Sequence, residues 1–86
     1  MAVPAQIEQE VIDVLTDVSR RPIQPTPSSD LIADLGFDSL QVMETITEIE
    51  DRFDVKIAPE EVSRTRTVAQ VVALVSSLVE ARQQRG

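Results

Sequence analysis

Residues 34–40 read DLGFDSL, and they join a proline-rich loop to the start of a predicted helix. Asp38 is a favoured N-cap residue, and Gln41 follows it at the spacing of a capping box. We therefore expect the helix to begin at Asp38, with Gly36 permitting the sharp turn before it. Ser39 then lies in the first helical turn, where unpaired backbone N–H groups and the positive end of the helix dipole would favour a phosphate ester on its hydroxyl.

The segment that follows Ser39 has the spacing of an amphipathic helix. Its apolar residues recur at intervals of three and four positions, namely at Leu40, Met43, Ile46, Ile49 and Phe53. This pattern predicts one buried face that includes Phe53. We expect Leu40 and Met43 to face the core or to border the serine, and Met43 suits a contact surface as well as it suits the core.

Two more helices and a loop are predicted around this segment. Residues 4–20 predict a helix, because their apolar positions keep the helical interval and Pro22 stops the pattern. Residues 21–37 hold three prolines and predict an ordered loop rather than a linker between domains. A short helix is expected near residues 59–63, with Pro59 in its first turn.

The last segment is rich in valine, a residue that favours strands, yet its spacing is helical. Between Val68 and Val79 the apolar residues again recur at intervals of three and four positions. Thr67 and Gln70 have the spacing of a second capping box. We expect a helix here, with fraying over residues 81–86.

These elements predict one all-α domain over residues 1–86, with its core at about 5–80. Three longer helices and a short one would form a four-helix bundle with a long first loop. The longest unbroken apolar run, residues 71–75, is too short to span a bilayer, and no secretory signal pattern precedes it. We therefore expect a soluble cytoplasmic protein, and Met1 suggests a free-standing chain.

The composition excludes several classes of function. The chain has 15 acidic and 8 basic residues, a formal charge of −7, which argues against nucleic acid binding. It has no cysteine and no histidine, which excludes disulfides, thiolate nucleophiles, Ser–His triads and most zinc sites. An autonomous enzyme is therefore disfavoured, although chemistry by carboxylates alone stays open.

The run of residues 35–40, Leu-Gly-Phe-Asp-Ser-Leu, resembles the attachment motif of the acyl and peptidyl carrier protein family, and the resemblance covers residues 5–80. It implies that Ser39 bears a 4′-phosphopantetheine arm, with Gly36, Asp38 and Leu40 around the attachment point. A separate phosphopantetheinyl transferase would attach the arm from coenzyme A. The thiol of such an arm holds acyl groups as thioesters, so the protein would be a shuttle and not a catalyst. The alternative is that the Asp-Ser pair only caps a helix.

Charge divides the chain into two regions. Residues 38–61 hold eight acidic and two basic residues, a net of −6, whereas residues 62–86 hold one acidic and four basic residues, a net of +3. In the carrier protein family that this sequence resembles, the second helix binds basic patches on partner enzymes. That resemblance implies partner binding by Glu44 and Glu48. The apolar residues Val42 and Met43 are close to the serine in the sequence and are further candidates for partner binding. The alternative is that the acidic residues form a solvated face.

Arg64 and Arg66 depart from the acidic third-helix region of fatty-acid-type carriers, although they could simply pair with nearby carboxylates. Together with Phe37 they favour a discrete carrier in a specialised lipid, polyketide or peptide pathway. We expect a monomer that meets acyl-loading, acyl-transfer or synthase enzymes. A housekeeping fatty-acid carrier is the first alternative, and an unmodified acidic interaction domain is the second. A carboxylate-dependent enzyme has no supporting metal-ligand pattern.

Overall fold

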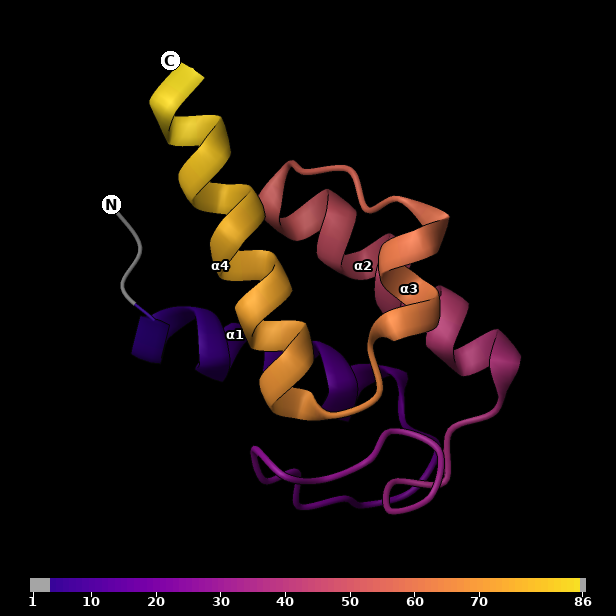
Figure 1. Cartoon of the computed structure of the whole chain (residues 1–86). Coiled ribbons are helices and arrows are strands. Elements are labelled where there is room, and N and C mark those ends of the chain that lie inside the picture. Colours follow the sequence, from indigo (N-terminus) through magenta and orange to yellow (C-terminus); the bar gives the residue numbers. More distant parts are fainter. Residues whose placement is uncertain (1–3, 86) are drawn as a thin grey trace.

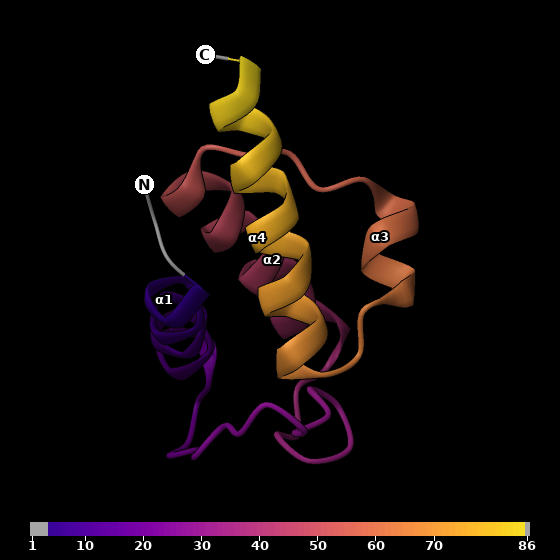
Figure 2. The same ribbon diagram turned by 60° about the vertical axis from the view of Figure 1, so that its left-hand side comes forward.

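The computed structural model describes residues 4–85, and that part of the chain contains four helices. They are α1 (Pro4–Val18), α2 (Ser39–Phe53), α3 (Pro59–Arg64) and α4 (Val68–Arg85). Helix α1 packs against α4 and α2, and the short α3 lies on the side of the bundle away from α1 (Figures 1 and 2). The predicted bundle of three longer helices and a short one is confirmed. None of the described helices is long and apolar enough to cross a membrane.

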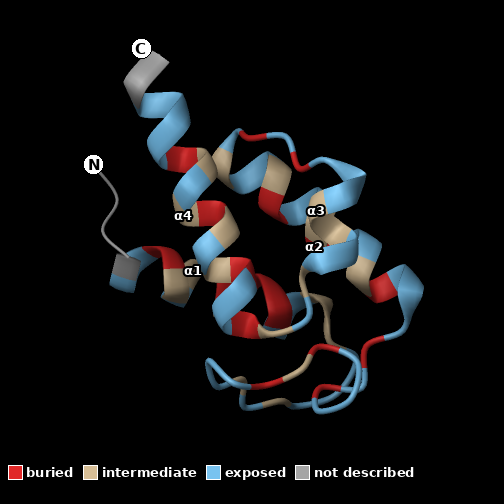
Figure 3. Cartoon of the chain, viewed as in Figure 1, coloured by how far each residue is buried: buried red, intermediate tan, exposed pale blue. Residues whose placement is uncertain are grey.

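The core lies where α1, α2 and α4 face one another (Figure 3). Helix α1 supplies Val11, Val14 and Leu15, which are completely buried, as the predicted apolar spacing requires. Val75 of α4 and Ile49 of α2 are equally buried. The helical interval of these residues, rather than the strand preference of valine, therefore decides the fold of the last segment.

The long first loop is fastened to the start of α4. Asp30 and Thr67 form an isolated antiparallel bridge, and the N–H of Leu31 donates to the Arg66 carbonyl at 2.9 Å. The N–H of Val68 donates to the Ser29 carbonyl at 3.0 Å. The bond from Val68 satisfies one of the N–H groups that the start of α4 leaves unpaired. The loop is therefore ordered, as its proline content predicts.

Asp30 organises the turn that leads towards the serine. Its Oδ1 accepts hydrogen bonds from the N–H groups of Ile32 and Ala33, each at 2.9 Å. The backbone N–H of Asp30 donates in turn to Asp34 Oδ2 at 2.7 Å. The bonds from Ala33 and Ile32, helped by the nearby Arg66 guanidinium, hold the pKa of the Asp30 carboxyl below its usual value of 3.8.

We expect the Asp30 carboxylate to stabilise the fold at neutral pH and to lose this effect in acid. Its pKa is lower in the folded chain, so the stabilisation is complete above the unfolded-state pKa and disappears as the pH falls through the folded-state value. Thermal melts of wild type and Asp30→Asn between pH 7 and pH 3 measure this effect. The two melting temperatures should differ most at neutral pH and converge in acid.

The control for this titration is Asp51→Asn, which removes an exposed carboxylate from α2. It controls for the loss of one negative charge from an acidic chain. Asp30→Asn and Asp51→Asn melting curves that run parallel to each other at every pH would refute the special role of Asp30.

The buried face of α2 differs in part from the predicted one. Gln41, Thr45 and Ile49 face the core, whereas Leu40 and Met43 are exposed. Ile49 of the predicted stripe is buried, and Leu40 and Met43 border the serine, which is one of the two positions expected for them. The apolar spacing did not indicate Gln41 and Thr45, because hydrogen bonds allow these polar side chains to be buried. The Thr45 hydroxyl, for example, donates to the Gln41 carbonyl at 2.8 Å.

Phe53 lies at the end of the predicted buried face. The ring is partly buried and packs against the core, so Phe53 is on the predicted face without being fully buried. Phe37, in the loop before α2, is the buried aromatic residue and is 2% exposed. The orientation of α2 that turns Gln41 towards the core leaves Phe53 at the edge of the buried face.

The ends of two helices also differ from the predictions. Helix α1 ends at Val18, two residues before the predicted end. Helix α4 continues to Arg85, so residues 81–85 are helical where fraying was expected, and Gly86 lies outside the described residues. In this last part of α4, Arg82 Nη2 lies 3.1 Å from Oδ2 of Asp54, the residue that caps the end of α2.

Candidate functional site

Ser39 is the first residue of α2, and its position is set by a capping box. The N-cap residue Asp38 has an extended backbone, and its Oδ1 accepts a hydrogen bond from the Gln41 N–H at 2.8 Å. The Gln41 Oε1 accepts the Asp38 N–H at 3.2 Å. Both predicted capping bonds are therefore present. Ser39 itself is exposed, and no hydrogen bond of its hydroxyl is found within residues 4–85.

The turn before the serine requires a glycine. Gly36 has a φ of +74°, a conformation that residues with a Cβ rarely adopt. An added Cβ there would also meet the end of the exposed, flexible Arg21 side chain, which can move aside, so the positive φ is what favours glycine. Leu35 and Phe37 on either side are buried, so the turn is held at both ends by the core. The two buried residues therefore fix the turn, and Asp38 and Ser39 follow it at the surface.

Two large apolar side chains lie exposed beside the serine. Leu40 is 58% exposed and Met43 is 55% exposed, in contrast to the polar residues that α2 buries. Both line a shallow groove of about 530 Å³ between the end of α1 and the first half of α2. Glu44 and Glu48, four positions apart, line the same groove. Val42 is partly buried and packs against the core, so it is less available to a partner than Met43.

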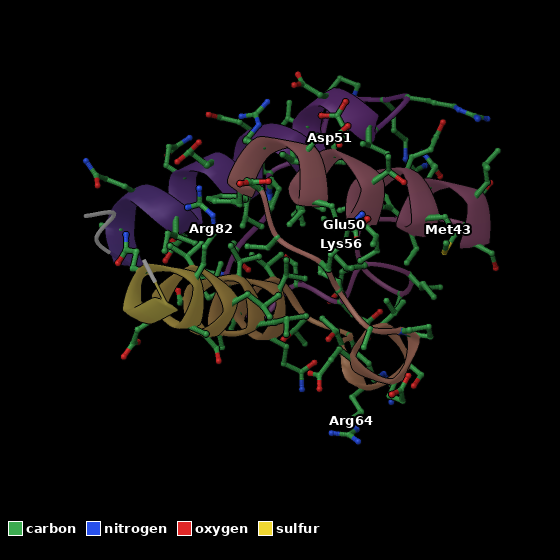
Figure 4. The ribbon with its side chains drawn as sticks, turned by 90° about the horizontal axis from the view of Figure 1, so that it is seen from above. Met43, Glu50, Asp51, Lys56, Arg64 and Arg82 are labelled. Atoms are coloured by element: carbon green, nitrogen blue, oxygen red, sulfur yellow. The ribbon has the colours of Figure 1, made fainter. Side chains whose placement is uncertain are left out.

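Arg64 and Arg66 are separated from this groove and each lies near a carboxylate. Arg64 Nη1 is 3.9 Å from Glu61 Oε1, and Arg66 Nε is 3.7 Å from Asp30 Oδ2. Figure 4 shows Arg64 projecting outward from α3. Ion pairs of this length at the surface contribute little to stability, about 0–1 kcal/mol. The Arg64 and Arg66 side chains are 75% and 77% exposed, so both guanidinium groups are accessible from solvent.

A second, larger hollow of about 890 Å³ lies towards the other end of α2. It is lined by charged residues of α2, of the loop after it and of α4, among them Glu50, Asp51, Lys56 and Arg82. Figure 4 shows Met43 near one end of α2 and Asp51 and Arg82 towards the other. Glu50 Oε2 accepts the Ile57 N–H at 2.8 Å, so part of this charge holds the α2–α3 loop. The hollow does not include the serine.

No group of three or more metal-binding side chains occurs among the described residues. The chemistry of the serine end is that of an exposed hydroxyl at a helix start, with N–H groups and the positive helix terminus around it. A phosphodiester on that hydroxyl fits these residues, because nothing buries or occupies the oxygen and the local field favours an anion.

Comparison with known proteins identifies the family. The profile described as "Phosphopantetheine attachment site" matches residues 9–75. The chain therefore belongs to the phosphopantetheine-binding family of acyl carrier proteins, whose members carry groups and are not catalysts themselves. The predicted family and fold are confirmed.

Individual relatives agree with this assignment. An acyl carrier protein of Amoebophilus asiaticus is 38% identical over 69 residues, which span 79% of this chain and 86% of that protein. The meromycolate extension acyl carrier protein of Mycolicibacterium aurum is 37% identical over 71 residues, 83% of this chain and 71% of that one. A solved structure from Mycobacterium tuberculosis, provisionally assigned as an acyl carrier protein, superposes with a TM-score of 0.79 at 32% identity. It covers 83% of this chain and 96% of that one.

Sequence reasoning missed three features of this site. The burial of Phe37 could have been suspected from an aromatic residue beside a glycine turn. The bond of the Gln41 side chain to α1 needed tertiary structure, because its partner is 23 residues away. The contact of Arg21 with Gly36 had no signal in the sequence at all.

Proposed function

We propose that Ser39 carries 4′-phosphopantetheine and that the protein is a discrete acyl carrier. The observation that supports this most is the exposed Ser39 hydroxyl at the capped start of α2 in a chain of the phosphopantetheine-binding family. When bound, the arm supplies a thiol on which acyl groups travel as thioesters. Gly36 and Asp38 shape the turn, and Leu40 lies beside the attachment point.

The residues of this chain have limited tasks in the attachment. The Ser39 oxygen attacks the phosphorus next to pantetheine in coenzyme A, the diphosphate P–O bond breaks, and adenosine 3′,5′-bisphosphate leaves. We assign the base that takes the serine proton to the separate phosphopantetheinyl transferase. The capping box holds the first turn of α2, and the exposed Ser39 hydroxyl lies at the positive end of the helix dipole, which favours the incoming phosphate.

Incubation with coenzyme A and a broad-specificity transferase tests the proposal. Intact-mass measurement should show a gain of one phosphopantetheinyl group per chain. An unchanged mass of the folded wild type would favour the alternative class, an unmodified acidic domain that binds partners through its surface. Omission of coenzyme A is the control.

We further propose a specialised pathway for this carrier. Among its relatives are carriers named for meromycolate extension, although the similar protein of Amoebophilus asiaticus has no such qualification in its name. The accessible Arg64 and Arg66 near α3 support the specialised alternative over a housekeeping fatty-acid carrier. The cytoplasmic location, the monomeric state and the extent of the domain over residues 1–86 stay predictions.

We expect Glu44 and Glu48 to guide partner enzymes towards the serine. Both are exposed and line the groove that contains Leu40 and Met43. Glu44→Lys or Glu48→Lys should lower kcat/KM for modification roughly tenfold at low salt, chiefly through slower association. Added salt should shrink the difference, because it screens exposed charges. Stopped-flow and steady-state rates at two ionic strengths measure both effects.

The matched control for these reversals is Glu80→Lys, an exposed position on α4 that changes the net charge by the same amount. Equal rates for the Glu44, Glu48 and Glu80 variants would show that the acidic face is solvated surface with no role in partner binding.

Arg64→Glu with Arg66→Glu, in the same assay, should improve exchange with fatty-acid-type enzymes and impair it with native partners, since like charges suppress unsuitable partners. Unchanged rates with both enzyme sets would remove the support for a specialised pathway.

A further inference from the structure

We propose that Gln41 is a positioning residue that ties the serine-bearing turn of α2 to the end of α1. The inference rests on the proposed modification of Ser39, and it concerns how that serine is held for the transferase. Gln41 lies two positions after Ser39 in the first turn of α2. Its side chain turns to the interior, whereas the serine lies at the surface.

Gln41 joins three segments through both ends of its side-chain amide. Its Oε1 accepts the Asp38 N–H at 3.2 Å, which fixes the N-cap. Its Nε2 donates to the carbonyl of Val18 at 3.5 Å, and Val18 is the last residue of α1. The Val18 carbonyl belongs to the group of C-terminal acceptors that a helix leaves unpaired. One side chain therefore links the cap of α2, its first turn and the end of α1.

The burial of this amide calls for an explanation beyond capping alone. Gln41 is 8% exposed, while the apolar Leu40 and Met43 on the same helix are more than half exposed. Burying an amide costs free energy unless it is hydrogen-bonded, and here both polar atoms have partners. An ordinary capping box needs no such burial. Gln70 performs the same capping on α4 from an exposed position.

The position of Gln41 separates its role from that of a contact residue. A transferase that docks on Leu40, Met43, Glu44 and Glu48 meets exposed side chains, whereas Gln41 is covered by the fold. A substitution at Gln41 therefore acts through the placement of the Ser39 turn. Small displacements of a reacting group reduce the rate of the chemical step more than they reduce docking.

The first variant is Gln41→Leu, which removes both side-chain bonds and keeps a similar volume. We expect kcat for phosphopantetheinylation to fall about tenfold to 100-fold, with KM little changed because the exposed docking residues remain. Gln41→Glu keeps an oxygen for the Asp38 N–H but cannot donate to Val18, so it should recover only part of the rate. Gln70→Leu removes the corresponding cap of α4 and should leave kcat unchanged.

A second readout does not depend on the transferase. In the unmodified protein, amide hydrogen exchange measured by NMR should accelerate at Ser39 and at the next residues of the first turn in Gln41→Leu, and not in Gln70→Leu. Assays are run below the melting temperature of every variant, so that unfolding does not contribute.

The outcomes separate this inference from the proposed function. A wild type that gains no phosphopantetheine refutes the proposed function, whatever the exchange rates show. A wild type that is modified, together with a Gln41→Leu variant of wild-type kcat and wild-type amide exchange, refutes only the positioning role. Equal losses of kcat in Gln41→Leu and Gln70→Leu would also refute it, because a general loss of stability would then explain both.

Discussion

Phe37→Ala is expected to destabilise the domain by about 3–5 kcal/mol, the usual cost of deleting a fully buried aromatic ring. The Phe37 side chain is 2% exposed and belongs to the same core cluster as Leu31 and Leu35. The stability of small domains lies near the low end of ~5–15 kcal/mol, so this variant should be partly unfolded at room temperature. Urea unfolding followed by circular dichroism measures the change.

Phe53→Ala is the matched control for this substitution. It deletes the same ring from a partly buried site at the end of α2, so its cost should be clearly smaller. Equal destabilisation by the two variants, or a larger effect at Phe53, would show that the buried face of α2 has been assigned wrongly. If Phe37→Ala lost less stability than Phe53→Ala, the core would not anchor the turn before Ser39.

Ser39→Ala is expected to abolish phosphopantetheinylation completely while leaving the fold intact. The hydroxyl is exposed and forms no hydrogen bond among the described residues, so its removal costs little stability. The other serines stay available in this variant, so a residual mass gain would place the modification elsewhere. Intact mass after incubation with coenzyme A and transferase, together with a thermal melt of each variant, measures both expectations.

Ser77→Ala provides the control, since Ser77 is an exposed serine on α4, remote in sequence from the motif. It should be modified at the wild-type rate. Loss of modification in Ser77→Ala, or a large drop in melting temperature in Ser39→Ala, would contradict the account of the site.

Local chemistry made much of the fold predictable. The caps at Asp38 and Thr67 depend on residues three positions apart, so the sequence alone displays both partners, and both capping boxes are present. The three longer helices were predictable for the same reason, because the 3.6-residue period is a local property, and Pro59 indicated the start of the short α3. The serine could be located at the start of α2 from that cap alone.

Tertiary contacts decided what the sequence could not show. The apolar interval left open whether Leu40 and Met43 face the core or border the serine. It did not indicate the burial of Gln41 and Thr45, because their hydrogen-bond partners lie on the backbone, where side-chain hydropathy does not register them. Partner binding by the acidic face and by the two arginines stays a prediction, because it depends on the surface of another protein.

The most direct test of the central claim is peptide mapping by mass spectrometry of the protein isolated from its own host. The account predicts that the peptide containing Ser39 bears a phosphopantetheine group, with an acyl cargo on its thiol in part of the population. A protein that carries no such group in its host, or that carries it on another residue, would contradict the claim that this chain is an acyl carrier loaded at Ser39.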